Sequence, residues 1–254
     1  MFGVERRSKI LSLLNEKKSI TVQEAAEGFG VTEETIRRDL KVLEGQGLLM
    51  RTHGGAVLAD DSKAEAPLEI RQGINIKGKD AIGREAAKLV KDGDTIILDA
   101  STSSLFVARH IKDRVGVTVI TNAEKVVLEL SDCEEITVIC TGGTLRHKSL
   151  SYVGRAAESM LSNYHADMVF LSCKGFSPDK GFTDSNEQES DIRKLMIACS
   201  EKVIYLCDHT KFDKVGYVTT ARLTDTDIFI SDSSISQEWQ CKLKDAEVIL
   251  RIAD

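Results

Sequence analysis

The chain has 254 residues, of which 42% are apolar and 29% are charged, and its formal net charge at pH 7 is −6. This length allows two compact domains, and because no run of about eighteen apolar residues occurs, we expect no membrane-spanning helix and no membrane partner. The N-terminus enters a charged amphipathic segment without the apolar stretch of a secretion signal, so we expect a cytoplasmic protein. Six cysteines lack CxxC spacing and histidines at metal-ligand spacing, which indicates reduced core residues and neither a metal nor a cofactor site.

Two helices, of which the second is short, are predicted before the first tight turn. Thr21 and Glu24 form a capping box that opens the second helix, which ends near Gly28. Gly30 then occupies the turn that a helix-turn-helix requires. The apolar face of the first helix consists of Ile10, Leu13 and Leu14.

A third helix and a hairpin follow. Thr32 is the expected N-cap, and Gly45 and Gly47 end the helix. Its buried stripe, at i, i+4 and i+7, consists of Ile36, Leu40 and Leu43. Residues 48–51 are then predicted to form a strand, with Gly54 and Gly55 as the hairpin turn. This order predicts a winged helix-turn-helix DNA-binding domain over residues 1–58.

The outward face of the third helix and the hairpin carry the candidate DNA contacts. In a helix-turn-helix the first residues of the recognition helix approach base edges, while wing residues touch the backbone or the minor groove. The alternative is a merely solvated charged face, and the cap, the turn glycine and the wing argue against it. The predicted DNA-contacting residues are Thr21, Thr32, Glu34, Thr35, Arg37, Arg38, Lys41, Arg51, Thr52, His53, Gly54 and Gly55.

The rest of the chain is predicted to be a linker and an α/β domain. Residues 59–78 lose clear periodicity and contain one of only two prolines, which indicates a linker that becomes helical near residues 68–76. Short β-branched runs then alternate with helical segments, which predicts a mainly parallel sheet in a domain over residues 79–254. A helix with Ile82, Ala86, Leu89 and Val90 precedes runs at 95–98, 117–120, 136–139, 168–171, 203–206 and 228–230.

Polar residues follow five of these runs, at the strand ends that converge on one crevice in an open α/β sheet. Hydroxyls at a helix start and two lysines suit a phosphate, whereas aspartate and asparagine suit sugar hydroxyls. At any one position a helix cap or a turn residue is the alternative, but five coincident strand ends favour a pocket for a small phosphorylated polyol. The predicted effector-binding residues are Asp99, Ser101, Thr102, Ser103, Thr121, Asn122, Gly142, Gly143, Lys174, Gly175, Asp208 and Lys211.

Charge is divided unevenly between the two parts. Residues 1–58 hold 9 Lys or Arg and 8 Asp or Glu, a net +1, and the remainder holds 25 against 32, a net −7. Because neutralised phosphates supply most non-specific affinity for DNA, one such domain should bind weakly. We therefore expect a homo-oligomer, a dimer or a tetramer, that sets two domains on double-stranded operator DNA.

The stretch ERRSKI to HGGAV at residues 5–57 resembles the N-terminal domain of the DeoR family of bacterial transcriptional regulators, most closely in TIRRDL at 35–40 and HGGA at 53–56. Residues 79–232 resemble the family's sensor domain, which is similar in fold to ribose-5-phosphate isomerase. The resemblance implies a repressor of a carbohydrate-metabolism operon that a phosphorylated sugar releases from its operator. One departure is Ser101, which stands where the family's Asp-x-Gly-Thr-Thr has glycine. Glu187, Glu189, Arg193 and Lys194 share one helix that faces either the pocket mouth or solvent.

Two other functions compete at this point. A sugar-phosphate isomerase or deaminase carrying a DNA-binding module would use Asp99, Asp208 or Glu187 as its base. A DNA-binding scaffold would bind no small ligand. The first leaves the winged helix without a purpose, and the second leaves the polar strand ends unexplained. We therefore expect a ligand-responsive regulator that is not an enzyme and has no catalytic residues.

Overall fold

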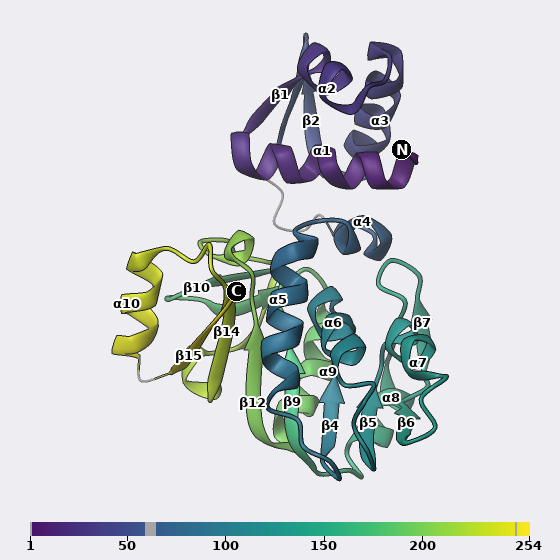
Figure 1. The fold of residues 1–254 in the computed structure, drawn as a ribbon, viewed down its shortest axis with the longest axis vertical. Helices are drawn as coiled ribbons and strands as arrows, with labels where there is room; N and C mark the ends of the chain where they lie inside the picture. The colour runs from purple at the N-terminus through teal and green to yellow at the C-terminus, as the bar shows by residue number, and fades with distance from the viewer. Residues whose placement is uncertain (1, 59–64, 247) are drawn as a thin grey trace. The chain divides into compact units, whose positions relative to one another are not determined.

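The computed structural model describes residues 2–58, 65–246 and 248–254 (Figure 1). The chain folds as two compact units, Met1–Ile76 and Lys77–Asp254. Each unit has its own apolar core. Among the described residues, no helix has both the length and the apolar character needed to cross a membrane.

The first unit is a winged helix, as the sequence predicts. Among its described residues, three helices are followed by a hairpin, and a short strand joins that hairpin in an antiparallel sheet of order β1-β3-β2. Its elements are α1 (Gly3–Lys17), β1 (Ser19–Thr21), α2 (Val22–Phe29), α3 (Glu33–Gly45), β2 (Leu49–Thr52) and β3 (Gly55–Leu58). The predicted stripe of Ile36, Leu40 and Leu43 is buried at the centre of this unit.

Local hydrogen bonds set the turn between α2 and α3. Thr21 caps α2 through the predicted capping box, since its Oγ1 accepts from the Glu24 N–H at 3.1 Å and its own N–H donates to Glu24 Oε2 at 3.2 Å. Gly30 ends α2 in the left-handed conformation, with φ 64°. Thr32 then caps α3 by accepting from the Thr35 N–H at 3.3 Å. These bonds account for the short, sharp turn that orients α3.

The first unit continues past its predicted end at residue 58. Helix α4 (Leu68–Gln72) packs on α1, where Ser8 Oγ donates to the Ile70 carbonyl at 3.0 Å and Ile70 joins the core of the unit. The second half of the predicted linker is thus folded, because Leu68 and Ile70 bury apolar surface. Residues 59–64 of that linker lie outside the described residues. The unit boundary at Ile76 and Lys77 falls close to the predicted start of the second domain at residue 79.

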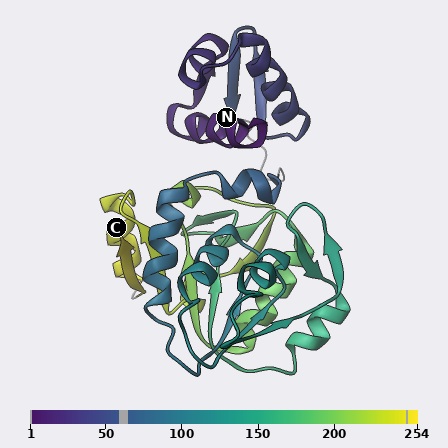
Figure 2. The ribbon, with the colours of Figure 1, turned by 45° about the vertical axis from the view of Figure 1, so that its right-hand side comes forward.

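The second unit is built on a parallel sheet (Figures 1 and 2). Within the described residues this sheet has seven strands, in the order β15-β14-β12-β9-β4-β5-β6, and every neighbouring pair is parallel. The strands are β4 (Thr95–Leu98), β5 (Val117–Thr121), β6 (Ile136–Cys140), β9 (Ala166–Leu171), β12 (Ser200–Leu206), β14 (Ile228–Asp232) and β15 (Ile249–Ala253). All six predicted runs are strands of this sheet, and the edge strand β15 was missed.

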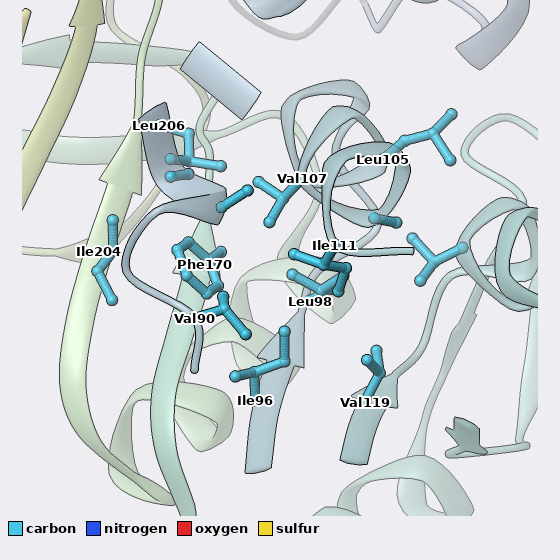
Figure 3. Packing of buried hydrophobic residues seen from close by; sticks show 14 of the residues in the cluster. Val90, Ile96, Leu98, Leu105, Val107, Ile111, Val119, Phe170, Ile204 and Leu206 are labelled. Atoms are coloured by element: carbon cyan, nitrogen blue, oxygen red, sulfur yellow. The ribbon is translucent and has the colours of Figure 1, made fainter. Parts of the chain in front are cut away.

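Helices cover both faces of the sheet. Alternate residues of a strand point to opposite faces, so Ile96 and Leu98 enter one apolar cluster and Ile97 enters another. Figure 3 shows the first cluster, which α5 (Ile76–Ala87), α6 (Thr102–His110) and α7 (Glu124–Leu130) complete. The second cluster packs under α8 (Arg155–Leu161), α9 (Glu187–Ala198) and α10 (Gln237–Asp245).

Smaller elements occupy the connections between strands. One is the hairpin of β7 (Thr144–Arg146) and β8 (Ser151–Val153), and another is the antiparallel sheet of β10 (Gly175–Ser177), β11 (Gly181–Asp184) and β13 (Val218–Ala221). The 3-10 helices η1 (His209–Lys211) and η2 (Leu223–Asp225) complete the unit. None of these short elements was predicted, because they lack the continuous β-branched apolar runs that mark the strands of the large sheet.

Candidate DNA-binding and effector-binding sites

The predicted recognition residues lie on the outward face of α3. Arg38 is the most open of the ion-paired arginines there, with 79% of its side chain exposed, and it contacts Glu34 at 3.3 Å. Arg37 pairs with Glu33 at 2.7 Å. Thr32 and Lys41 are exposed as well, and Thr35 is partly buried beside Thr32. The helix therefore presents arginines beside hydroxyls, which are groups that can bind base edges and phosphates.

A buried ion pair, which the sequence reading did not identify, holds α3 against α1. Asp39 is 4% exposed and accepts from Arg6 Nε at 2.5 Å and from Arg7 NH1 at 3.3 Å. Asp39 lies on the inner side of α3, directly after the exposed Arg38. In the sequence, the one indication that Asp39 is buried was its position directly before Leu40, a residue of the buried stripe. This pairing fixes the face that α3 turns outward.

In the wing, the two adjacent glycines have different surroundings. Gly54 lies in the turn, and a Cβ placed on it would meet no atom within 4 Å. Gly55 is buried in strand β3, where a Cβ would lie 1.9 Å from the Ile20 carbonyl oxygen of β1. The turn, predicted at Gly54 and Gly55, therefore lies one residue earlier, at His53 and Gly54. Gly55 instead allows β1 to approach β3 closely. Arg51, Thr52 and His53 are exposed, and Arg51 pairs with Glu44 at 2.6 Å.

The five predicted strand ends meet along one edge of the second unit. Leu98 of β4 lies opposite Thr121 of β5 and Phe170 of β9, and this register continues to β6 and β12. The connections that leave β4 and β9 run to opposite sides of the sheet, which makes the gap outside their carboxyl ends the topological switch point. Ligands of open α/β sheets bind at such points.

Asp99, directly after β4, is a buried organiser of this edge. Its carboxylate accepts from the Ser101 N–H at 3.0 Å, Ser104 Oγ at 2.6 Å, the Ser172 N–H at 3.2 Å and Arg193 Nε at 2.7 Å. A carboxylate has about four acceptor positions, so these bonds leave no room for a sugar hydroxyl. The direct ligand role expected of Asp99 is therefore replaced by a structural one.

The start of α6 keeps the chemistry of a phosphate site. Ser101 is the N-cap and accepts from the Ser104 N–H at 3.1 Å, so its hydroxyl serves the helix. Thr102 and Ser103 occupy the first turn and are buried. The first N–H groups of a helix have no acceptor within it, and the helix dipole favours an anion there. This turn follows β4 at the switch point and suits a phosphate group.

A network of buried charges contacts the start of α6 through Asp99. Arg193 of α9, with 6% of its side chain exposed, contacts Asp99 at 2.7 Å, Asp184 at 2.9 Å and Glu189 at 3.7 Å. Glu189 also accepts from Arg146 at 2.8 Å. Glu187 and Lys194 lie on an exposed face of α9, whereas Glu189 and Arg193 belong to its buried face.

Two buried acceptors on this edge have no hydrogen-bond partner among the described residues, Asn122 Oδ1 and Asp208 Oδ2. Asn122 is oriented by the bond from its Nδ2 to the Tyr152 carbonyl at 3.0 Å. Burial alone would raise the pKa of Asp208, but Lys211 and the buried Lys79 hold it below its ordinary value. Asp208 is therefore an ionised acceptor. Lys79, which the sequence reading did not single out, supplies part of the local positive charge.

Thr121 and the predicted glycines have structural explanations. Thr121 Oγ1 donates to the Leu98 carbonyl at 2.7 Å and accepts from the Ala123 N–H. Gly142 and Gly143 have φ angles of 61° and 111°, which favour glycine. A Cβ placed on Gly175 would lie 2.4 Å from the Lys214 carbonyl oxygen, so the backbone approach there requires glycine. Strands β6 and β12 are four positions apart, about 19 Å at the usual strand spacing, so the residues after them do not share one small ligand.

Together these features define a winged-helix DNA-binding protein with a second α/β unit whose sheet edge has the character of a ligand site. The family model described as the DeoR-like helix-turn-helix domain matches residues 6–62, and that described as the DeoR C terminal sensor domain matches residues 74–233. The chain therefore belongs to the DeoR family of transcriptional regulators, as its sequence motifs predict.

Known proteins agree with this assignment. The chain is 44% identical over 248 residues to the uncharacterized HTH-type transcriptional regulator YulB of Bacillus subtilis (strain 168), covering 98% of this chain and 96% of that protein. It is 34% identical over 245 residues to the HTH-type transcriptional repressor GlcR of the same strain, covering 96% and 94%. Relatives that are regulators favour a regulator over an enzyme. The structural similarity to ribose 5-phosphate isomerase A from Methanocaldococcus jannaschii is weak. The match covers 55% of this chain and 56% of the isomerase chain, with 18% identity and a TM-score of 0.42.

Proposed function

We propose that this regulator represses a carbohydrate-metabolism operon and that a phosphorylated sugar, bound at the carboxyl edge of β4, β5, β9 and β12, releases it from its operator. The observation that carries the proposal is the combination on one sheet edge of a helix N-terminus with two unpartnered buried acceptors, Asn122 Oδ1 and Asp208 Oδ2. A buried acceptor without a partner is costly, so two of them at the switch point of the sheet suit a ligand that donates hydrogen bonds to them.

Each end of a sugar phosphate has matching groups on this edge. The phosphate accepts from the first N–H groups of α6 and from the hydroxyls of Thr102 and Ser103. Lys79 and Lys211 lie near enough to Asp208 to lower its pKa, and they add positive charge close to the anion. Sugar hydroxyls donate to Asn122 Oδ1 or to Asp208 Oδ2, which lie on opposite sides of the phosphate because β5 and β12 are three positions apart in the sheet. A sugar without phosphate would make only the second set of contacts, so phosphorylation should decide affinity.

Operator binding is proposed to occur through α3 and the wing of two copies of the chain in the cytoplasm. Arg37 and Arg38 are placed at base edges and phosphates of the major groove, and Arg51 to Gly54 along the backbone or the minor groove. The effector acts by favouring an oligomer state in which the two winged helices no longer match the half-sites. Because a ligand shifts this equilibrium only through different affinities for the two states, effector and operator must weaken each other's binding reciprocally.

The test of the effector site is a thermal-shift screen of phosphorylated pentoses, hexoses and ketoses against the same sugars without phosphate. A ligand that binds the native state raises the melting temperature, by an increment that grows with its concentration. At least one of Asp208→Asn and Asn122→Ala should lose the increment, whereas Glu187→Gln, an exposed site on α9, should keep it. No increment with any phosphorylated sugar would reject the proposed ligand class.

The test of regulation is fluorescence anisotropy of operator DNA, titrated with protein in the presence and absence of the best ligand from the screen. We expect the ligand to weaken operator binding, and Arg38→Ala to abolish specific binding while leaving the thermal shift by ligand intact. Tighter operator binding in the presence of ligand would mean that the ligand recruits the regulator to its operator and does not release it. If NMR shows that the protein converts any sugar phosphate to a product, that result would favour the isomerase or deaminase alternative.

A further inference from the structure

Two cysteines lie in contact beside the proposed effector edge. Cys173 follows β9 and Cys207 follows β12, and their sulfur atoms are 3.5 Å apart. Cys207 is fully buried, whereas Cys173 retains 7% of its surface. Of the other four cysteines, Cys133 and Cys199 are partly buried, and Cys140 and Cys241 are exposed. The pair is therefore a buried dithiol with one member within reach of solvent.

The backbone places these residues at a distance that a disulfide can span. Strands β9 and β12 are parallel neighbours with Tyr205 opposite Leu171, and each cysteine comes two residues later. Neighbouring strands lie about 4.8 Å apart, within the Cα separation of about 4.4 to 6.8 Å that disulfides adopt. Ser172 Oγ also donates to the Leu206 carbonyl at 2.7 Å, which ties the two strand ends together just before the cysteines.

We propose that Cys173 and Cys207 are a site of reversible disulfide formation, closed by a disulfide-class oxidant and reopened by thiols. Cys173 attacks the oxidant RSSR, which forms a mixed disulfide and releases one RSH. The Cys207 sulfur then attacks Cys173 Sγ, and the second RS group leaves with the Cys207 proton as RSH. Two protein thiols are thus oxidised while one RSSR is reduced to two RSH.

The order of the two steps follows from the surroundings of each thiol. Cys207 has no exposed surface, so the oxidant reaches Cys173 first. Burial and the contact with Cys173 raise the pKa of the Cys207 thiol well above its usual value, which keeps Cys207 protonated before that step. Cys173 is consequently the attacking residue and Cys207 the resolving one. Such reversible disulfides in reduced compartments are usually catalytic or redox-sensing.

Closure would act on the proposed effector site, and this consequence rests on the proposed function. Lys174 directly follows Cys173, and Asp208 directly follows Cys207. Bringing the sulfurs from 3.5 Å to about 2.05 Å draws these two positions together. The helix-capping bond from the Thr210 N–H to Asp208 Oδ1, 2.9 Å long, lies in the same segment. We therefore expect the disulfide form to lose its response to the sugar phosphate.

The experiment uses the full chain with Cys140→Ser and Cys241→Ser, which removes the two exposed thiols and prevents cross-linking between copies. The protein is treated with oxidised glutathione or diamide, and non-reducing peptide mapping by mass spectrometry follows the products. We expect a Cys173–Cys207 linked peptide that is two hydrogens lighter than the two reduced peptides together, and full recovery with dithiothreitol. In the added Cys207→Ala variant, Cys173 should stop at the mixed disulfide. In Cys173→Ala, Cys207 should stay unmodified.

Two free thiols at these positions, after Cys133 and Cys199 have reacted, would overturn the proposal. A linked peptide that persists after dithiothreitol would overturn its reversibility. Thermal shift with the best sugar phosphate is measured on the reduced and oxidised forms, with loss expected only after oxidation. If the reduced protein binds no sugar phosphate while the linked peptide forms, the proposed effector class fails and the disulfide site stands. An unchanged response after complete oxidation refutes the coupling.

Discussion

Replacing Arg193 with methionine tests whether the buried charge network supports the second unit. Methionine keeps much of the side-chain volume but removes the guanidinium that contacts Asp99 at 2.7 Å and Asp184 at 2.9 Å. Removing one partner of a buried ion pair costs about 3–5 kcal/mol, because the other charge stays buried. For a unit of this size, each kcal/mol lowers the melting temperature by about 2–4 °C, so we expect a loss of about 6–20 °C.

The pH dependence of this loss separates a charge effect from a packing effect. Burial already raises the pKa of Asp184 above its ordinary value in spite of Arg193, and without Arg193 the rise should be larger. A carboxyl whose folded pKa is raised contributes stability below its unfolded pKa and loses that contribution as the pH rises through the folded pKa. The deficit of Arg193→Met relative to the parent protein should therefore be largest near neutral pH and shrink as the pH falls.

The assay is urea unfolding followed by circular dichroism at several pH values. Lys194→Met is the matched control, because Lys194 is the next residue of α9 and 46% of its side chain is exposed. The control should change stability by less than about 0.5 kcal/mol. A deficit for Arg193→Met below about 1 kcal/mol, or one that stays constant with pH, would contradict the assigned network.

Three further changes have outcomes that the structure dictates. Gly55→Ala drives a Cβ into the Ile20 carbonyl, so operator affinity by anisotropy should fall together with the melting temperature, whereas Gly54→Ala should leave the melting temperature unchanged. Thr21→Ala removes the capping box of α2 and should cost about 1 kcal/mol in urea unfolding; a neutral result would contradict the cap. Because the pKa of Asp208 is lowered, its ionisation stabilises the fold above its unfolded pKa, and the stability difference from Asp208→Asn should vanish as the pH falls through the folded value.

The sequence predicted the elements with strong periodicity and the edge on which polar residues gather. The stripe of α3 has a clear helical period and the six runs are rich in β-branched residues, whereas short strands such as β1 have neither signal. Roles that depend on distant partners were out of reach. Asp99 was expected to bind ligand, but its carboxylate is taken up by Ser172 and Arg193, which lie 73 and 94 residues away in the chain. A single sequence does not show which charges of a helix find buried partners, so Arg193 was assigned to either the pocket mouth or solvent, and Lys79 was not singled out.

The net charge of only +1 on residues 1–58 is reflected in ion pairs on the predicted DNA-binding face. Arg37, Arg38 and Arg51 each contact a glutamate of the same unit, at 2.7, 3.3 and 2.6 Å. Exposed pairs of this kind are worth about 0–1 kcal/mol, so DNA phosphates can displace them at small cost, yet the glutamates remain to repel the backbone. Non-specific DNA should therefore gain little from these arginines, and in the proposed dimeric reader discrimination depends on base contacts made by both copies. Under the proposed mechanism, a modest shift in the spacing of the two copies is then enough to release the operator.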